Sequence, residues 1–489
     1  MLKKLVGQTA IYGISSIVAR LLNYLLLAPY FTRVMGPAEY GVITDMYALI
    51  PFALVILTMG LETGYFRFAG QAESEAGKKR VFGSTWGVVS LAAAVFFAVV
   101  LLFRNDIADA TGYSDHPSYI WCVGLIIALD AASAIPFARL REQGRAGLFV
   151  GLRMTSVVVN LVLCLFFLSV LPSLAARYEW LSGIWDPNFG VGYVFVANLV
   201  ASTVVLLLLV IVSKQAPRID RRIAAKALLY SFPLLLSGIA GTANEYIDRQ
   251  MIKYLLPDEV AMSSLGIYGA VVKIAVVMLL FTQMYRLAAE PFFLSGVKSE
   301  DFRQTNAHAM KYYVIVSAVI FLGVALFADL FALIVGADFR SGIAILPVVL
   351  ATNILTGLTF NLSFWYKQSG QTRYALYITG TGLAVTLLFT WLLVPAIGYA
   401  GAAWASLLCS LATTVLSYIL SRRHYPIPYD LRAIGLYLLL GAILYCVGFL
   451  SARLPAIPKY IINFVLVLAF IGYATHRERL LEKIKHKQL

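Results

Sequence analysis

Four cationic side chains lie inside long apolar stretches of this sequence: Arg20, Arg249, Lys273 and Arg286. A cation at the centre of a bilayer costs roughly 2.5–3.5 kcal/mol on insertion scales, so such residues usually face a polar cavity and mark a transport path. Positive charge in a cavity of low dielectric constant favours an anion, and an arginine can hold a phosphate by two parallel hydrogen bonds. The first chemistry that the sequence predicts is therefore anion binding within a membrane.

The local sequence separates these cations into two kinds. Lys273 has no acidic residue three or four positions away, and Arg20 has Asn23 one turn further along instead of an acid. Both are predicted to bind substrate, together with Asn23. Arg249 follows Glu245 and Arg286 precedes Glu290 by four residues, a spacing at which opposite charges neutralise each other on a helix. Arg249 and Arg286 are therefore either local ion-pair partners or further cavity residues.

Three acidic residues in apolar stretches have a different potential use. They are Asp45, Asp130 and Asp248. A buried carboxylate can carry a proton or bind a cation, and acidic side chains within membrane helices often form ion pathways. We expect these three residues to be candidates for coupling transport to a proton or a sodium ion. The membrane potential is the alternative driving force.

The elements that must position these residues are transmembrane helices. Of 489 residues, 60% are hydrophobic and only 13% are charged, a composition that excludes a soluble globule and a disordered chain. Apolar runs of about 20 residues, each long enough to cross the hydrocarbon core as a helix, recur along the whole chain. We predict fourteen helices: 5–32, 41–66, 83–103, 119–139, 148–171, 191–213, 227–252, 265–294, 308–329, 343–366, 374–395, 399–421, 432–452 and 458–475.

The net charge is +14, and its distribution along the chain indicates a membrane protein rather than a nucleic-acid-binding protein. With the N-terminus placed in the cytoplasm, the inside segments carry 27 Lys and Arg and the outside loops carry seven. Such an asymmetry is the positive-inside signal, and it predicts a multi-pass protein with both termini in the cytoplasm.

The polar, basic loop 214–226 divides the chain into two halves that resemble each other. Arg20 lies 20 residues before Tyr40, and Asp248 lies 20 residues before Tyr268. Repeats of six helices share one orientation and are related by a pseudo-twofold axis along the membrane normal. We therefore predict an all-α integral membrane protein with an N-terminal lobe (1–213), a C-terminal lobe (226–421) and an appended helix pair with a basic tail (432–489).

The remaining reactive residue types form no pattern. The four cysteines fall in predicted helices, and the five histidines are dispersed. We expect no metal, no cofactor and no catalytic residue, because neither a disulfide framework nor a metal-ligand spacing is present.

Several short motifs, taken in order, resemble one known family. They are Arg33-Val-Met-Gly-Pro-Ala-Glu-Tyr-Gly41, Gly60-Leu-Glu62 with Arg67, Asn244-Glu-Tyr-Ile-Asp-Arg249, Gly266-Ile-Tyr268 and Gly336-Ala-Asp-Phe339. In this order and spacing they are similar to the polysaccharide-unit (O-antigen type) flippases of the multidrug/oligosaccharidyl-lipid/polysaccharide exporter superfamily. The resemblance covers nearly the whole chain and includes the number of helices.

The resemblance implies a transporter, not an enzyme, in the bacterial inner membrane. Its substrate would be an undecaprenyl-pyrophosphate-linked oligosaccharide, moved to the outer leaflet by alternating access for surface polysaccharide or lipopolysaccharide biosynthesis. Membrane lipids and the polysaccharide polymerase machinery are the other expected partners, and the helix pair after residue 432 would accept the lipid tail.

Three other functions compete with this interpretation. A lipid II flippase shares both the appended helix pair and the interior cations. A drug antiporter of the same superfamily would have twelve helices and an acidic cavity. A membrane polysaccharide polymerase or ligase would need catalytic residues at the outer face, where the longest segment, 172–190, offers only Arg177, Glu179 and Asp186.

Overall fold

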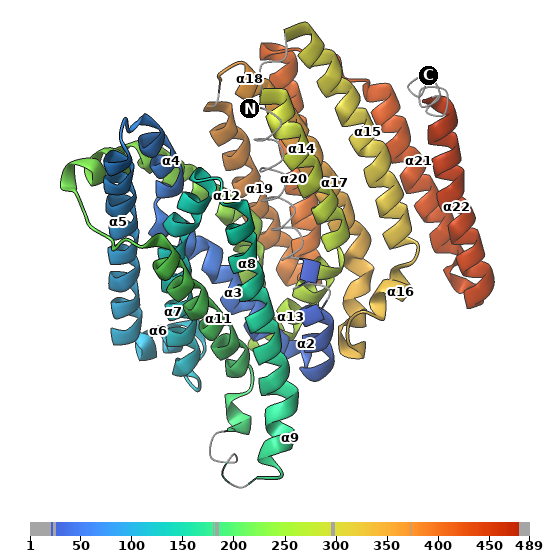
Figure 1. Cartoon of the computed structure of the whole chain (residues 1–489). Helices are drawn as coiled ribbons and strands as arrows, with labels where there is room; N and C mark the ends of the chain where they lie inside the picture. The colour runs from blue at the N-terminus through green and yellow to red at the C-terminus, as the bar shows by residue number, and fades with distance from the viewer. Residues whose placement is uncertain are drawn as a thin grey trace. The chain divides into compact units, whose positions relative to one another are not determined.

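The computed structural model describes residues 21–22, 26–178, 180, 185–294, 299–371 and 373–478, and all regular structure in them is helical (Figure 1). Twelve helices within these ranges are long and apolar enough to cross a membrane, and one further pair is bent by 51° at a break. These thirteen elements confirm the predicted stretches from 41–66 to 458–475. Residues 5–20 and 23–25 of the first stretch, 5–32, lie outside the described residues, so the expected total of fourteen is confirmed only in part.

The chain divides by its internal contacts into two compact units, Met1–Gly266 and Ile267–Leu489. This division falls later than the loop 214–226, because α12 (Arg221–Leu255) packs against α3 (Pro37–Thr58), α4 (Leu61–Gln71) and α5 (Glu75–Leu102). The lobes predicted from the sequence are repeats, whereas the units reflect packing. The lobe boundaries remain a prediction.

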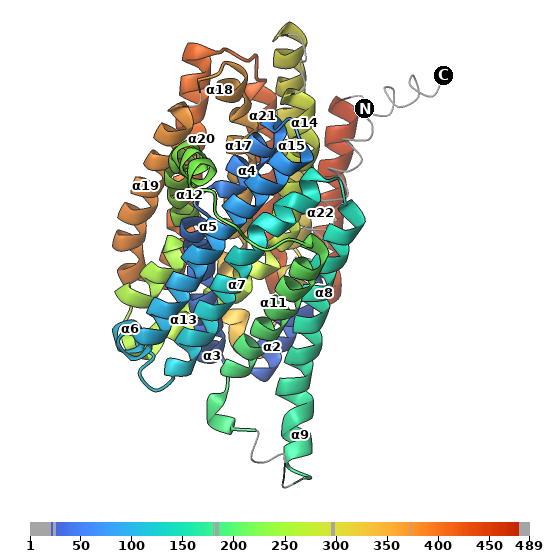
Figure 2. The same ribbon diagram turned by 60° about the vertical axis from the view of Figure 1, so that its left-hand side comes forward.

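The helix α7 (Pro117–Glu142) is the core of the first unit. In its most apolar window 72% of the residues are buried, more than in any other described span. It packs against α5, α3 and α11 (Gly192–Ser213), as Figure 2 shows. The Trp86 indole N–H of α5 donates to the Ala132 carbonyl of α7 over 3.0 Å. The remaining helices of this unit are α2 (Ala28–Val34), α6 (Arg104–Thr111), α8 (Ala146–Leu165), α9 (Leu171–Ala175) and the start of α13 (Asp258–Ile274).

The long membrane segment 37–71 is interrupted at Met59 and Gly60. Both residues have positive φ angles, 50° and 68°, which end α3 and begin α4. A Cβ atom on Gly60 would lie 3.1 Å from the Ser231 carbonyl oxygen, and one on Gly64 would lie 2.7 Å from the Ser231 hydroxyl. Glycine at these two positions therefore lets α12 approach the α3–α4 junction closely.

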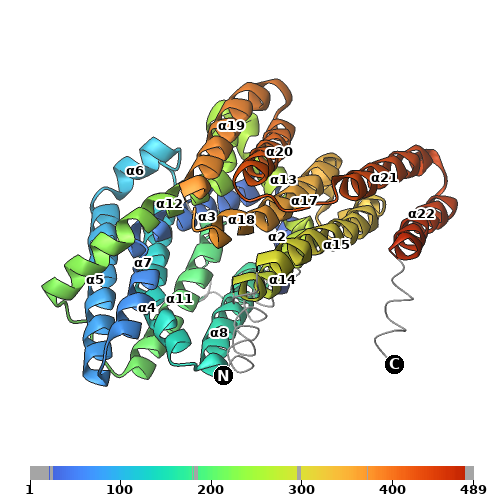
Figure 3. The same ribbon diagram turned by 90° about the horizontal axis from the view of Figure 1, so that it is seen from above.

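The second unit contains a helix pair that is fixed to one neighbour. Its other helices are α14 (Val276–Leu294), α15 (Ser299–Ala325), α16 (Ala328–Ala332), α17 (Leu346–Leu362), α18 (Phe364–Gln368), α19 (Arg373–Ile397) and α20 (Tyr399–His424). The pair α21 (Leu431–Leu450) and α22 (Ala456–Arg477) packs beside α15 (Figures 1 and 3). Lys311 of α15 pairs with Glu478 at 2.6 Å, and the Asn463 amide donates to the Leu326 carbonyl at 2.7 Å. These two buried polar contacts fix the pair to α15 along its length.

The predicted single span 265–294 is two helices. α13 ends at Ile274 and α14 begins at Val276, with a bend of 51° between them. Kinks usually occur at proline or glycine, and neither residue stands at this break. Hydropathy predicts where apolar segments lie and carries no signal for a bend of this kind.

Candidate functional site: a buried charged cluster and the cations along the chain

The first turn of α3 sets the position of an acidic residue. Pro37 occupies the first helical position, where its fixed φ angle suits a helix and its missing N–H is not needed. The Gly36 backbone N–H donates to a carboxylate oxygen of Glu39 over 3.0 Å, which closes the turn. Asp45 follows eight residues after Pro37, about 12 Å along the helix axis.

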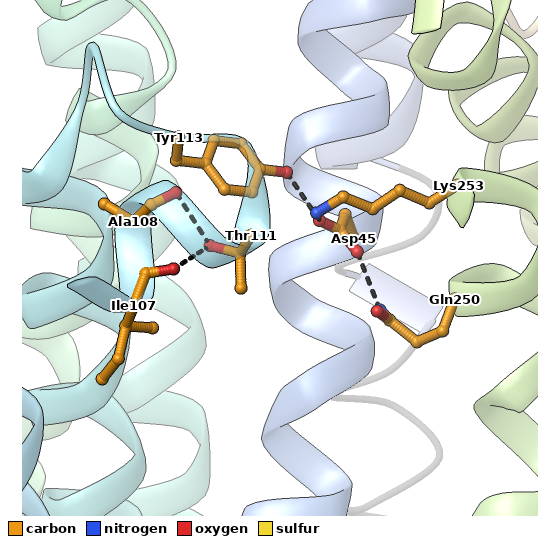
Figure 4. Close-up of polar contacts among 7 residues, drawn as sticks. All are labelled: Asp45, Ile107, Ala108, Thr111, Tyr113, Gln250 and Lys253. Atoms are coloured by element: carbon orange, nitrogen blue, oxygen red, sulfur yellow. Dashed lines mark hydrogen bonds and ion pairs between the residues drawn. The ribbon is translucent and has the colours of Figure 1, made fainter. Parts of the chain in front are cut away.

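Asp45 is fully buried at the centre of a polar cluster (Figure 4). Its Oδ1 accepts a hydrogen bond from the Gln250 amide over 2.7 Å. Its Oδ2 accepts from the Tyr113 hydroxyl over 2.6 Å and from the Lys253 ammonium over 2.5 Å. Three donors on one carboxylate satisfy most of its hydrogen-bonding capacity, which is the condition under which a charge is tolerated in an apolar interior.

Lys253 provides the opposite charge, and its side chain is only 8% exposed. The Nζ atom lies 4.5 Å from the centre of the Tyr113 ring and 5.3 Å from that of Tyr254, so aromatic faces surround the ammonium group. The predicted helix 227–252 stops one residue before Lys253, which left this lysine in an outside loop; that boundary is wrong because α12 continues to Leu255. The spacing of Gln250 and Lys253, one turn apart on a helix, is the signal that could have placed both on one face.

Tyr113 reaches the cluster from the connection between α6 and α7. Gly112 has a φ angle of 76°, and the Tyr113 backbone N–H donates to the Ala108 carbonyl over 2.7 Å. The Thr111 hydroxyl donates to the Ile107 carbonyl over 2.6 Å, which secures the same turn (Figure 4). Burial, with the nearby Asp45 charge, raises the pKa of the Tyr113 phenol. The phenol therefore stays protonated and remains a donor to Asp45.

The cluster is electrically neutral and joins three separate elements. Asp45 comes from α3, Gln250 and Lys253 come from α12, and Tyr113 comes from the α6–α7 connection. Its geometry holds these elements together at one end of the first unit. Asp45 as an ion-coupling residue remains a prediction, with the added condition that an incoming cation must displace the Lys253 ammonium.

The other two predicted acids lie in different surroundings. Asp248, five residues before Lys253 on α12, pairs with the Arg249 guanidinium at 3.0 Å. Arg249 also donates to the Glu245 carbonyl over 2.8 Å. Asp130 of α7 accepts from the Ser202 hydroxyl of α11 over 2.8 Å. No hydrogen bond within the described ranges joins Asp130 to the Asp45 cluster.

The remaining predicted cations are placed separately. Lys273 is half-buried and lies at the end of α13, two residues before the break. Arg286 of α14 is exposed, and its guanidinium carbon lies 4.8 Å from the centre of the Phe360 ring. Arg20 and Asn23 lie outside the described residues. Their substrate-binding roles, like those of Lys273, Arg249 and Arg286, remain predictions. Among the residues described, no group of three His, Cys, Asp or Glu could hold a metal ion.

The fold is similar to solved transporter structures. A structure titled "Lipid II flippase MurJ, inward closed conformation" matches with a TM-score of 0.70 at 12% identity, over 96% of this chain and 99% of that chain. An inward-facing multidrug resistance MATE family transporter of the MOP superfamily matches with a TM-score of 0.64 at 15% identity, over 84% and 97%. The MATE multidrug transporter DinF-BH gives 0.62 at 16% identity, over 86% and 95%. A search of curated proteins found no significant match.

The helical architecture and these likenesses define a multi-pass integral membrane protein with the fold of the multidrug/oligosaccharidyl-lipid/polysaccharide exporter (MOP) superfamily. Within it, the family described as "Polysaccharide biosynthesis protein" matches residues 5–295, more than half of the sequence. The chain belongs to this polysaccharide biosynthesis protein family, as the motifs around residues 33–41 and 244–249 predicted.

Proposed function

We propose that this protein flips undecaprenyl-pyrophosphate-linked oligosaccharide units from the cytoplasmic to the outer leaflet of the bacterial inner membrane by alternating access. The observation that carries the proposal is membership of the polysaccharide biosynthesis protein family together with a transporter fold matched over 96% of the chain. Movement of a lipid-linked sugar unit across the membrane agrees both with a family described by polysaccharide biosynthesis and with a fold similar to that of transporters.

The extent of the fold matches supports a lipid-linked substrate over a soluble drug. The solved lipid II flippase covers 96% of this chain, and the MATE transporter covers 84%. The difference between 96% and 84% of 489 residues is about 59 residues. The lipid II flippase structure thus matches a longer part of this chain than the MATE transporter does.

The cations along the chain match the negative charge of the proposed substrate. A pyrophosphate carries negative charge that must be compensated in a low-dielectric cavity. We assign its contacts to Arg20, Asn23, Lys273, Arg249 and Arg286. Moving one charge through 100 mV is worth roughly 2.3 kcal/mol, so the membrane potential favours outward movement of an anion. Coupling to a proton or a sodium ion through Asp130, Asp248 or Asp45 is the other driving force to be tested.

The test is reconstituted flipping. Liposomes with the purified protein and a fluorescent undecaprenyl-pyrophosphate oligosaccharide are treated with a membrane-impermeant quencher, and the protected fraction is followed with time. The protein should raise the exchange rate over protein-free liposomes. Lys273→Gln should lower it about tenfold or more, because a hydrogen bond to a charged group is worth about 1.5–3 kcal/mol. The matched control is Lys226→Gln, an exposed lysine at the start of α12. Equal rates with and without protein would contradict the proposal.

A lipid II flippase is the second candidate, and the TM-score of 0.70 to the solved lipid II flippase favours it. Both substrates carry a polyprenyl pyrophosphate, so the cations alone do not separate them. The same liposome assay with fluorescent lipid II distinguishes them. Preference for the oligosaccharide over lipid II is expected, and the reverse preference would assign the protein to peptidoglycan synthesis.

A further inference from the structure

A cavity of about 1050 Å³ lies within the second unit, where α15, α20 and α21 meet. Three arginines from these helices line it: Arg303 of α15, Arg422 at the end of α20 and Arg432 at the start of α21. We call this cavity the arginine pocket. It lies outside the set of cations that the transport proposal uses.

The loop between α20 and α21 builds one wall of the arginine pocket. Pro426 and Pro428 limit its backbone freedom, and Ile427 between them is 8% exposed and belongs to the apolar cluster around Phe302. The guanidinium carbon of Arg303 lies 4.5 Å from the centre of the Tyr425 ring. The wall is therefore anchored in the protein core, and one of the three arginines is positioned on an aromatic face.

Among the side chains that the structure describes, the arginines of the pocket have no acidic ion-pair partner. The one acidic residue in the lining, Asp430, uses its Oδ1 to cap α21 by accepting from the Ala433 backbone N–H over 3.0 Å. Three arginines line one cavity, and the one acidic residue of its lining is already hydrogen-bonded to the backbone. Such a cavity is suited to a multivalent anion.

Three helix ends meet at the arginine pocket: the C-terminal end of α20 carries a partial negative charge, and the N-terminal ends of α15 and α21 oppose it. α21 begins at Leu431, and Arg303 lies in the first turns of α15, which begins at Ser299. The N-terminal end of a helix carries a partial positive charge and favours anions. The remaining lining is partly apolar, with Tyr418, Ile427 and Leu431. A ligand with a phosphate and an apolar body suits such a lining better than a free ion.

We propose that the arginine pocket binds the phosphate headgroup of an anionic phospholipid of the cytoplasmic leaflet. The basic segment that contains Arg422 and Arg432 is on the cytoplasmic side in the orientation predicted from the charge distribution. Basic pockets between transmembrane helices on that side are suited to anionic headgroups, and the lipid is present at high local concentration. The proposal concerns lipid binding and does not depend on the transport reaction.

Native mass spectrometry of the full chain in detergent tests this proposal. Delipidated protein is titrated with phosphatidylglycerol, with phosphatidylcholine and with inorganic phosphate. Phosphatidylglycerol should bind most tightly. Each of Arg303→Gln, Arg422→Gln and Arg432→Gln should weaken it about fivefold, the effect of about 1 kcal/mol per basic residue near an anionic lipid.

Arg423→Gln is the matched control, because Arg423 is exposed beside Arg422 at the same helix end and does not line the cavity. Its phosphatidylglycerol affinity should equal that of the unchanged protein. An equal loss in Arg423→Gln would assign the binding to general surface charge and overturn the proposal. Competition by inorganic phosphate at the same affinity would instead assign the pocket to a soluble phosphate. A thermal unfolding temperature that is unchanged in the absence of lipid identifies the variants that are folded. Arg432 is exposed, so Arg432→Gln should fold, and it keeps the test valid if the other variants do not fold.

Discussion

At the scale of single residues, the Asp45–Lys253 pair is the most constrained feature of the first unit. Both side chains are buried, and each compensates a charge that the interior would otherwise reject. Removing one partner of a buried ion pair leaves the other uncompensated and typically costs about 3–5 kcal/mol, whereas replacing both by apolar groups is often neutral. We therefore expect a single substitution to destabilise the protein more than the double substitution does.

Lys253→Met is expected to lower the thermal unfolding temperature of the purified protein strongly, because Asp45 then keeps only the donors Tyr113 and Gln250. Asp45→Leu combined with Lys253→Met should recover most of the loss. Lys78→Met is the control: Lys78 pairs with Glu142 at 3.3 Å, but its side chain is 35% exposed, and such pairs contribute about 0–1 kcal/mol. If the double variant unfolds lower than the single one, the cluster does not depend on charge compensation.

Of the four residues of this cluster, only Asp45 was predicted from the sequence. Asp45 stood out because an acid within an apolar stretch is unusual. Lys253 did not, because it stands near the end of such a stretch, and its partner is 208 positions away in the sequence. Pairing rules based on spacing apply within one helix. Contacts between helices depend on how the helices pack, which the sequence pattern does not contain.

Asp130 bears on the proposed role of Arg20. Asp130 is hydrogen-bonded to Ser202, so its carboxylate has a partner other than Arg20. If Arg20 holds a pyrophosphate by a planar double contact, Arg20→Lys should retain part of the surface polysaccharide output and Arg20→Gln almost none. Asp130→Asn added to Arg20→Gln should restore nothing. Restored output and membrane abundance in that double variant would make Arg20 an ion-pair partner of Asp130.

At the scale of elements, the beginning of α3 touches the backbone of α13. A Cβ atom on Gly41 would lie 2.0 Å from the Met262 carbonyl oxygen, and one on Gly266 would lie 1.9 Å from the Pro37 carbonyl oxygen. Backbone atoms cannot rotate away as a side chain can. The two glycines therefore set the distance between α3 and the start of α13.

Gly41→Ala is expected to destabilise the protein by about 1–3 kcal/mol, the usual range for overpacking, through separation of α3 from α13. Gly70→Ala is the matched control, because Gly70 lies in α4 and a Cβ atom there would meet nothing within 4 Å. Glycine to alanine within an open helix should instead stabilise slightly. Thermal unfolding in detergent distinguishes them, and equal unfolding temperatures for the two variants would contradict the close approach.

The elements themselves were largely predictable from hydropathy, and their interruptions were only partly so. The stretch 41–66 was predicted as one helix, and the structure divides it at Met59 and Gly60. Gly60 is a visible signal there, since glycine accepts a positive φ angle readily. Neither proline nor glycine stands at the break after Ile274, so the local sequence gives no signal for it.

At the scale of the whole molecule, the orientation in the membrane decides what each polar feature can do. The predicted orientation places the Asp45 cluster toward the outer face, because α3 begins and α12 ends on that side. It places the arginine pocket toward the cytoplasm. Both assignments follow from the distribution of Lys and Arg between loops, a property of the entire chain rather than of any helix.

Labelling of single cysteines with a membrane-impermeant maleimide in intact cells tests this orientation. Cys446 is the exposed native cysteine among the described residues and must first be changed to serine, whereas Cys122, Cys164 and Cys409 are buried. A cysteine at Ala216, an exposed position between α11 and α12, should react only after the membrane is opened. A cysteine at Asp109, exposed on α6, should react in intact cells, because Asp109 lies seven residues beyond Leu102, the outer end of α5 in the predicted orientation. The reverse labelling pattern would invert the molecule, place the arginine pocket at the outer leaflet and overturn the proposed direction of substrate entry.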